Sequence, residues 1–248
     1  MSEDLSGQVH VITGGGSGIG RVTAIALARE GAKVVVIGRT ESKLTAVADE
    51  ITAAGGVALP IVADVGYENQ VQRAFKIIVD EFEKVDLLLN NAGDEAFGKI
   101  SELTEEKWDE RERVNMKALF LTSKAALTTG GMLERESGLI INTASSNVRA
   151  SAGGWAAHIA FKHGALGLTE SLRKEVASSN IRVTLLCPGQ VGTEWALSPR
   201  VREESLRVHP MPRYLPPEDI AEITVFIAKL PPRVNIGELL VFHTGRVQ

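Results

Sequence analysis

Residues 9–20 read VHVITGGGSGIG and join an apolar run to a glycine-rich turn that leads into a helical pattern. Gly14, Gly18 and Gly20 give the spacing Gly-x3-Gly-x-Gly. Glycines are needed where the backbone turns sharply and comes close to a pyrophosphate, and the amides at the start of the following helix attract the anion. A flexible loop is the alternative interpretation, but a strand before the turn and a helix after it favour a phosphate-binding turn.

Seven short apolar runs follow one another along the chain, separated by longer amphipathic stretches. Most of these runs are apolar on both faces, as are strands buried between two layers of helices. The stretches between them are long enough for crossover helices. We therefore expect a doubly wound α/β fold with one seven-stranded parallel sheet. The expected strands are Val9–Thr13, Lys33–Gly38, Val57–Val62, Asp86–Asn90, Leu139–Ala144, Ile181–Cys187 and Glu238–Phe242.

Helical periodicity fills most of the intervals between the strands, and Thr104 with the acids after it predicts the start of a further helix. Residues 189–217 interrupt the alternation, because this segment is rich in proline and arginine. We expect it to form a lid over a substrate site. The clearest helical patterns cover Ile19–Glu30, Glu41–Ala54, Asn69–Glu83 and Trp155–Ser178.

The composition favours an ordinary globular enzyme. The chain has 248 residues, 44% of them hydrophobic and 23% charged, and we expect residues 1–248 to form one domain. The net charge of −4, with scattered basic residues, argues against nucleic acid as a partner. No apolar run approaches the roughly 18 residues that span a bilayer, and residues 1–7 lack the pattern of a signal peptide. With Cys187 as the only cysteine, we expect a cytoplasmic protein without disulfides or membrane insertion.

Several motifs follow one another along the whole chain. They are Thr13-Gly14-x3-Gly18-Ile19-Gly20, Asp64-Val65, Asn90-Asn91-Ala92-Gly93, Val114-Asn115-Met116, Ser145, Lys162, and Pro188-Gly189 with Thr193. In this order they resemble the motifs of the short-chain dehydrogenase/reductase family. This resemblance implies a Rossmann-type sheet with the strand order 3-2-1-4-5-6-7, and a homodimer or homotetramer. The last expected strand would lie at a sheet edge, a common place for subunits to meet.

The end of the second strand decides which nicotinamide cofactor is preferred. A carboxylate there would accept from a ribose 2′-hydroxyl and repel a 2′-phosphate. The sequence has Arg39 and Thr40 instead, and a guanidinium with a hydroxyl favours the phosphate, so we expect NADP(H) over NAD(H). If Arg39 is only a solvated residue, NAD(H) stays possible, because Ser17 in the turn adds no second basic group.

The resemblance also implies which residues contact each part of the cofactor. Asp64 and Val65 would border the adenine, Asn91 and Ala92 the adjacent ribose, and Val191 and Thr193 the nicotinamide amide. The cofactor-binding residues that we expect are Gly14, Ser17, Gly18, Ile19, Gly20, Arg39, Thr40, Asp64, Val65, Asn91, Ala92, Gly93, Lys162, Pro188, Gly189, Val191 and Thr193.

The catalytic positions depart from the family's pattern at one residue. The family uses a serine, a tyrosine and a lysine, with an asparagine that helps to hold a relay water. The tyrosine and lysine are four residues apart, which places both on one face of a helix. Here the pair is His158 and Lys162, the serine position is Ser145 with Ser146 as its neighbour, and the asparagine is Asn115. The tyrosines, Tyr67 and Tyr214, lie far from this register.

Histidine at this position leaves three functions open. An imidazole can give or take a proton near neutral pH, but the Lys162 ammonium one turn away disfavours its charged form, while Asp94 or Glu95 would favour it. The first function, which we expect, is that of an NADP(H)-dependent oxidoreductase acting on a carbonyl, alcohol or imine of a small molecule. The alternatives are a derived isomerase, cyclase or lyase, and a catalytically silent dinucleotide-binding protein.

Remaining signals bear on the substrate. The lid carries aromatic and basic side chains that suit an aromatic or anionic substrate, although a solvated loop would look the same. Arg149 adds slightly to the anionic alternative, and Cys187 is expected to pack in the core. The lid residues are Trp195, Arg200, Arg202, Arg207, His209, Met211, Arg213 and Tyr214.

Overall fold

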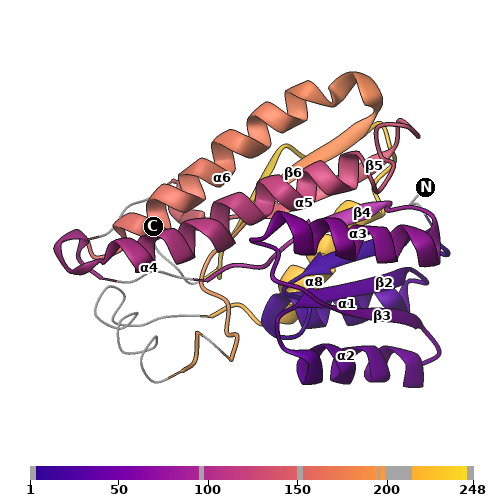
Figure 1. Ribbon diagram of the computed structural model, residues 1–248, viewed down its shortest axis with the longest axis horizontal. Helices are drawn as coiled ribbons and strands as arrows, with labels where there is room; N and C mark the ends of the chain where they lie inside the picture. Colours follow the sequence, from indigo (N-terminus) through magenta and orange to yellow (C-terminus); the bar gives the residue numbers. More distant parts are fainter. Residues whose placement is uncertain (1–3, 95–97, 150–152, 195, 199–213, 245–248) are drawn as a thin grey trace.

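Seven parallel strands form one twisted sheet at the centre of the chain (Figure 1). The computed structural model describes residues 4–94, 98–149, 153–194, 196–198 and 214–244. The strand order is β3-β2-β1-β4-β5-β6-β7, as expected from the sequence. The expected strands are confirmed, with some ends displaced by one residue. They are β1 (Val9–Thr13), β2 (Lys33–Gly38), β3 (Val57–Val62), β4 (Leu87–Asn90), β5 (Gly138–Thr143), β6 (Ile181–Pro188) and β7 (Glu238–Val241).

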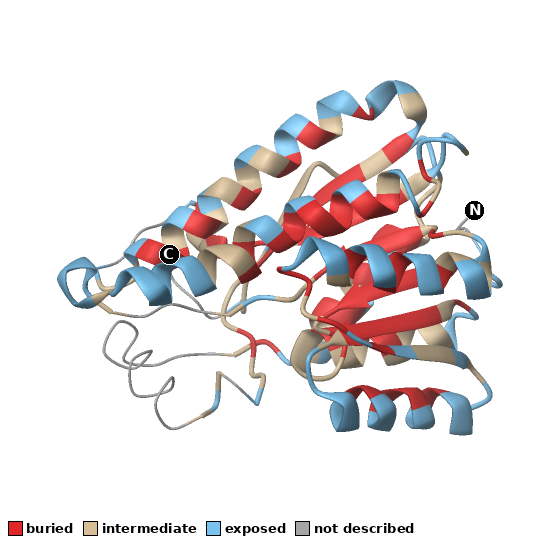
Figure 2. Cartoon of the chain, viewed as in Figure 1, coloured by how far each residue is buried: buried red, intermediate tan, exposed pale blue. Residues whose placement is uncertain are grey.

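Helices cover both faces of the sheet, so the fold is doubly wound. Buried side chains of α3, α5 and α6 pack on one face, among them Phe75 and Leu121. Those of α1, α2 and α8 pack on the other, among them Leu27 and Ile51. Figure 2 shows buried strands beneath helices whose outer faces are exposed. The helices are α1 (Gly18–Arg29), α2 (Glu41–Ala53), α3 (Glu68–Phe82), α4 (Glu105–Glu112), α5 (Ala118–Leu127), α6 (Ala156–Glu175) and α8 (Pro217–Ala228).

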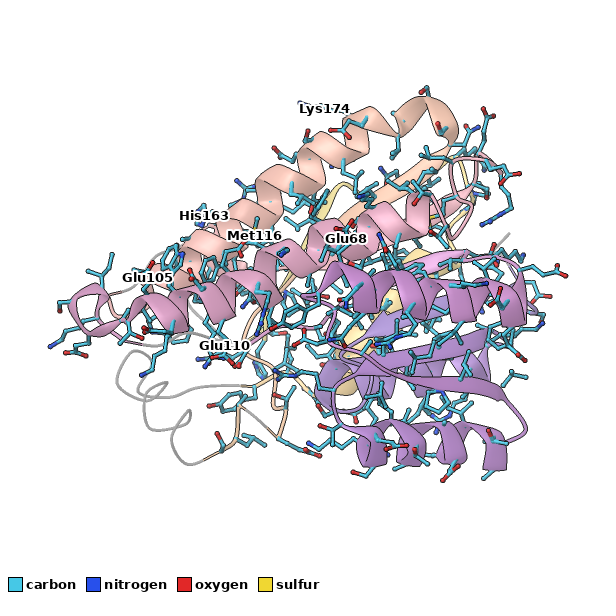
Figure 3. All side chains as sticks on the ribbon, viewed as in Figure 1. Glu68, Glu105, Glu110, Met116, His163 and Lys174 are labelled. Carbon is cyan, nitrogen blue, oxygen red and sulfur yellow. The ribbon has the colours of Figure 1, made fainter. Side chains whose placement is uncertain are left out.

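The predicted helix after Thr104 is confirmed, and it continues further than expected. The Thr104 hydroxyl accepts from the Lys107 amide at 3.4 Å and caps α4. A π-helical turn, Arg113–Lys117, then leads directly into α5. Such wide turns are rare inside helices and often lie at functional sites. Here the turn carries Asn115 and places Met116 against Gly164 of α6, where an added Cβ would lie 2.7 Å from Met116 Cε (Figure 3).

The expectation for α6 is wrong at its last turn. The helix ends at Glu175 and not at Ser178, because residues 177–179 form a 3₁₀ turn. Asn180 then adopts the left-handed conformation with φ of 53°, which stops helical hydrogen bonding and returns the chain to β6.

A network of buried polar side chains runs from α5 over β4 and β5 to α6, on the face of the sheet that both helices cover. The Thr122 hydroxyl of α5 donates to Asn90 Oδ1 of β4 at 2.7 Å, and Asn90 Nδ2 donates to Asn142 Oδ1 of β5 at 2.8 Å. Asn142 Nδ2 in turn donates to the Thr169 hydroxyl of α6 at 2.9 Å. These bonds fix α5 and α6 against the strands whose carboxyl ends carry the expected site.

Candidate active site

One cavity of about 740 Å³ lies at the carboxyl ends of the strands. In an open parallel sheet, ligands bind at this edge, near the point where the strand order reverses. Every cofactor-binding residue expected from the sequence lines this cavity except Gly20, and Asn115, Ser145 and His158 line it as well. The expected cofactor and catalytic residues therefore share one continuous space.

The glycine turn has the shape that a phosphate group requires. Gly18 has a φ of +51°, and a Cβ on Gly20 would lie 2.2 Å from the Gly14 carbonyl oxygen. Gly20 therefore stands behind the turn and allows it to close, instead of lining the cavity. The Ser17 side chain does not cap α1, so the first amides of that helix are left to an anion. A dinucleotide pyrophosphate fits this turn.

The Thr13 hydroxyl ties the glycine turn to the turn after β4. Its oxygen accepts from the backbone amides of Asn91 and Ala92, each at 3.0 Å, and its proton is directed to the Leu89 carbonyl at 3.4 Å. Thr13 is buried. This single side chain holds two expected cofactor-binding segments in a fixed relation.

Basic side chains line the cavity where β2 ends and α2 begins. Arg39 and Thr40 both line it, as expected for a pocket that takes a 2′-phosphate. Lys43 of α2 lines it too, which supplies the second basic group that the sequence analysis missed. Lys43 lies in the first turn of α2, which begins two residues after Arg39, so its nearness to the end of β2 could have revealed it.

Ser145, His158 and Lys162 all line this cavity. Ser145 ends the β5 loop, and its hydroxyl accepts from the Asn147 amide at 3.2 Å, which leaves the hydroxyl proton to donate. Lys162 Nζ donates to the Thr143 carbonyl at 3.4 Å. Ser146, the neighbour considered from the sequence, is buried and also lines the cavity.

His158 is 3% exposed, and its Nδ1 has no hydrogen-bond partner among the described residues. Its ring packs edge-on against Trp155, with ring centroids 5.4 Å apart. Burial, with a further contribution from the Lys162 ammonium, lowers the pKa of His158 to about 3. The expected effect of Lys162 is confirmed in direction, but burial is the larger cause. The imidazole is therefore neutral at pH 7 and is a poor proton donor.

The carboxylate expected to oppose Lys162 does not do so. Asp94 forms an ion pair with Arg111, so its charge is already neutralised by a cation on α4. Its backbone carbonyl accepts from Asn115 Nδ2 at 2.7 Å, and the same amide donates to the Arg111 carbonyl at 2.9 Å. Asn115 therefore fastens the loop after β4 to the π-helical turn. Glu95, the other acid considered, lies outside the described residues.

The structure changes the expectation for Arg149 and confirms the one for Cys187. Arg149 is held by Glu238 of β7 and does not line the cavity, so its support for an anionic substrate falls away. Cys187 is buried as expected, and burial raises the pKa of its thiol to about 12.

Most of the expected lid, residues 189–217, lies outside the described residues. The side chains that lie outside the described residues are Trp195, Arg200, Arg202, Arg207, His209, Met211 and Arg213. Of the lid residues singled out from the sequence, Tyr214 is described, and it lines the cavity.

Other lining residues went unnoticed as site residues in the sequence. Trp155, Asn147 and Glu194 line the cavity. Trp155 carries the clearest signal, because it stands three residues before His158, and residues three apart are neighbours on a helix surface. Asn147 lies in a three-residue 3₁₀ helix, residues 146–148, and Glu194 lies in a turn, and neither segment is long enough for sequence periodicity to give a direction.

The family model for short chain dehydrogenases matches residues 8–203 of the chain. The chain belongs to the short-chain dehydrogenase/reductase family. This family of oxidoreductases accounts for the parallel sheet, its strand order and the motifs along the cavity. Within the described residues, no helix is long and apolar enough to cross a membrane.

Relatives match the chain over nearly its whole length. An uncharacterized oxidoreductase of Staphylococcus aureus is 35% identical and aligns over 96% of this chain and 97% of its own. The crystal structure of a single-residue variant of actinorhodin polyketide ketoreductase with NADPH has a TM-score of 0.88, with 32% identity and 97% of each chain covered. A metagenomic short-chain oxidoreductase in complex with NADP has a TM-score of 0.83 and 31% identity, covering 96% of this chain and 98% of its own.

Proposed function

We propose that the chain is an NADP(H)-dependent oxidoreductase that acts on a carbonyl or alcohol group of a small organic molecule. The observation that carries this proposal is the single cavity joining the glycine turn and two basic residues to Ser145, His158 and Lys162. The NADPH and NADP complexes of the two similar structures support the choice of cofactor.

The residues around the glycine turn and the end of β2 bind and orient the dinucleotide. Bound NADPH supplies the hydride in this reaction class. The amides that follow Ser17 bind the pyrophosphate, while Arg39 and Lys43 attract the 2′-phosphate and so favour NADP(H) over NAD(H). Lys162 lies beside Gly93, where an added Cβ would be 3.8 Å from its Nζ, and it orients the ribose at the turn after β4.

The residues at the substrate end polarise an oxygen. Ser145 donates a hydrogen bond to the substrate oxygen, and the Lys162 ammonium favours the negative charge that develops there during reduction. The proton that completes the alcohol passes to this oxygen from the Ser145 hydroxyl, which regains a proton from water. His158 orients the substrate as a neutral imidazole, because its low pKa removes the charged form at neutral pH. His158 therefore does not act as an imidazolium acid at neutral pH, which the sequence had left possible.

The proposal is tested by incubating the protein with NADPH and a panel of ketones, aldehydes and imines. We expect NADPH to be consumed in a one-to-one ratio with reduced product. Product formation without NADPH consumption would instead identify an isomerase, cyclase or lyase. Tight NADPH binding with no product from any compound would identify a silent dinucleotide-binding protein.

We also propose that the chain forms a homodimer or homotetramer and works in the cytoplasm. β7 is the last strand of the sheet, and Phe226 on the neighbouring α8 is 56% exposed. Burying such apolar surface favours association. Light scattering measures the number of subunits, and fractionation of the source cells tests the compartment.

A further inference from the structure

Tyr214 reaches the cavity from a segment far along the chain from the catalytic positions. Its neighbour Leu215 forms a parallel bridge with Val191. Two backbone bonds fix this bridge: the Leu215 amide donates to the Gln190 carbonyl at 2.8 Å, and the Gly192 amide donates to the Leu215 carbonyl at 2.9 Å. The backbone at Tyr214 is thereby attached to the loop after β6, which the cofactor motif includes.

The Tyr214 hydroxyl is buried and has no hydrogen-bond partner among the described residues. A buried phenol hydroxyl normally finds a partner, because leaving it unpaired costs about 1–3 kcal/mol. The side chain lines the same cavity as Ser145, His158 and Lys162. A ligand in that cavity is the natural partner for this hydroxyl.

Tyr67, the other tyrosine of the chain, provides the contrast. Its hydroxyl is hydrogen-bonded to the Arg113 guanidinium, which also lies over its ring at 4.5 Å from the ring centre. Tyr67 does not line the cavity. The Tyr67 hydroxyl is therefore paired within the protein, while the Tyr214 hydroxyl has no hydrogen-bond partner among the residues that the structure describes.

We propose that the Tyr214 hydroxyl donates a hydrogen bond to an oxygen of the bound substrate. It thus supplies a phenol to a cavity in which residue 158 is histidine. The inference rests on the proposed function, because it assumes a substrate beside Ser145. The recognised chemistry is a hydrogen-bond-accepting oxygen, as in a ketone, an aldehyde or a hydroxyl group.

The kinetic test compares Tyr214→Phe with Tyr67→Phe, which removes the same atom from the satisfied tyrosine. We expect Tyr214→Phe to lower kcat/KM for the carbonyl substrate by about 10-fold or more, as loss of a donor to a reacting oxygen does. Its Kd for NADPH should stay within about twofold of the native value. Thermal unfolding of both variants checks that each one folds.

A spectroscopic test needs no turnover. Labelling tyrosine with ¹³C at Cζ gives two signals, and Tyr67→Phe identifies the one from Tyr214. NADP⁺ is added first and the ketones of the panel second, and we expect the Tyr214 signal to shift only in the second step. A shift on NADP⁺ alone, with weaker NADPH binding by Tyr214→Phe, would overturn the proposal and assign the hydroxyl to the cofactor.

The two proposals fail in different ways. If NADPH is never consumed but ketones still shift the Tyr214 signal, the proposed reduction is wrong and the contact with an oxygen stands. If NADPH is consumed and Tyr214→Phe behaves like Tyr67→Phe, the reduction stands and the contact is wrong. If no ketone shifts the signal, the contact is likewise wrong.

Discussion

At the scale of single residues, His158 stands where the motifs of the sequence lead us to expect a tyrosine. The imidazole occupies a buried place between Trp155 and Lys162, so its proton affinity is set by burial and by a neighbouring cation. A phenol at this place would carry a proton at neutral pH and extend a hydroxyl beyond the ring. The substitution therefore removes a neutral acid without removing the lysine that would tune it.

We expect His158→Tyr to increase the reduction of simple ketones with NADPH by about 10-fold to 100-fold. The reason is that a positioned general acid contributes on the order of 10²–10⁴ in rate, and part of this is lost because the surrounding residues are fitted to histidine. His158→Phe is the matched control, because it has the same ring without the hydroxyl. Equal rates for the two variants would contradict the role assigned to residue 158.

A second prediction at this scale concerns the preference for NADPH over NADH, which we attribute to Arg39 and Lys43. Calorimetric titration should show that NADPH binds more tightly than NADH, and that Arg39→Asp reverses the order. Lys43→Ala should weaken NADPH binding by about 10-fold and leave NADH binding unchanged, since hydrogen bonds to charged groups are worth about 1.5–3 kcal/mol.

Arg29→Asp is the control for this charge change, because Arg29 is exposed on α1 and does not line the cavity. If Arg29→Asp shifts the preference as much as Arg39→Asp does, the effect is one of overall charge. The 2′-phosphate would then not be bound by Arg39.

At the scale of elements, the strands were predictable because most of them are buried on both faces and give short apolar runs. The helices that escaped prediction are those without a clear polar face. In α5, the run Ala118–Leu127 is largely buried, and it follows a π-helical turn that shifts the helical period. α8 begins at Pro217, inside the segment assigned to the lid from its prolines.

The site residues, like the helices and strands, could be predicted only where a local sequence pattern fixes their positions. His158 and Lys162 could be paired from the sequence, because their spacing alone places them on one helix face. Tyr214 could not be brought to them, since its place depends on the bridge between Val191 and Leu215. The ion pair between Asp94 and Arg111 was equally hidden, because loop conformation decides which cation a loop carboxylate meets.

Alanine substitutions at two helical glycines test whether the phosphate-binding turn needs a glycine at position 20. We expect Gly20→Ala to abolish NADPH binding and to destabilise the fold, because the added Cβ would lie 2.2 Å from a backbone oxygen. Gly167→Ala in α6 has open space around the new methyl group and should stabilise the fold by about 0.5–1 kcal/mol. Urea unfolding and calorimetry measure both effects. Retained binding in Gly20→Ala would show that the turn can open.

At the scale of the whole molecule, stability in acid depends on buried histidines. His10 of β1 is fully buried, and its Nε2 lies 3.0 Å from Gln8 Oε1. Burial is the main cause that lowers the pKa of His10 to about 4 from 6.5, against the opposing charge of Asp86. The unfolded chain therefore binds this proton at a higher pH than the native chain does. The stabilisation is complete above pH 6.5 and is lost as the pH falls towards 4.

We expect His10→Leu to reduce the loss of unfolding free energy between pH 7 and pH 4 by about 3 kcal/mol, from the size of this pKa difference. Urea titrations at both pH values give the free energies. His163→Gln is the control, because it removes a histidine that is exposed on α6 instead of a buried one (Figure 3). An equal acid sensitivity in native and His10→Leu protein would assign the loss to other groups, His158 among them.

The hydrogen-bonded network through Asn90 and Asn142 restricts which residues can be exchanged one at a time. Each of its side chains satisfies the next, so a single replacement strands a polar atom in the interior, and these positions can change only in concert. Residue 158 is not part of this hydrogen-bonded network, and its Nδ1 has no hydrogen-bond partner among the described residues. The side chain at 158 can therefore be exchanged without breaking the hydrogen bonds that hold α5 and α6 on the sheet, so that the chemistry of this position and the integrity of the frame can vary separately.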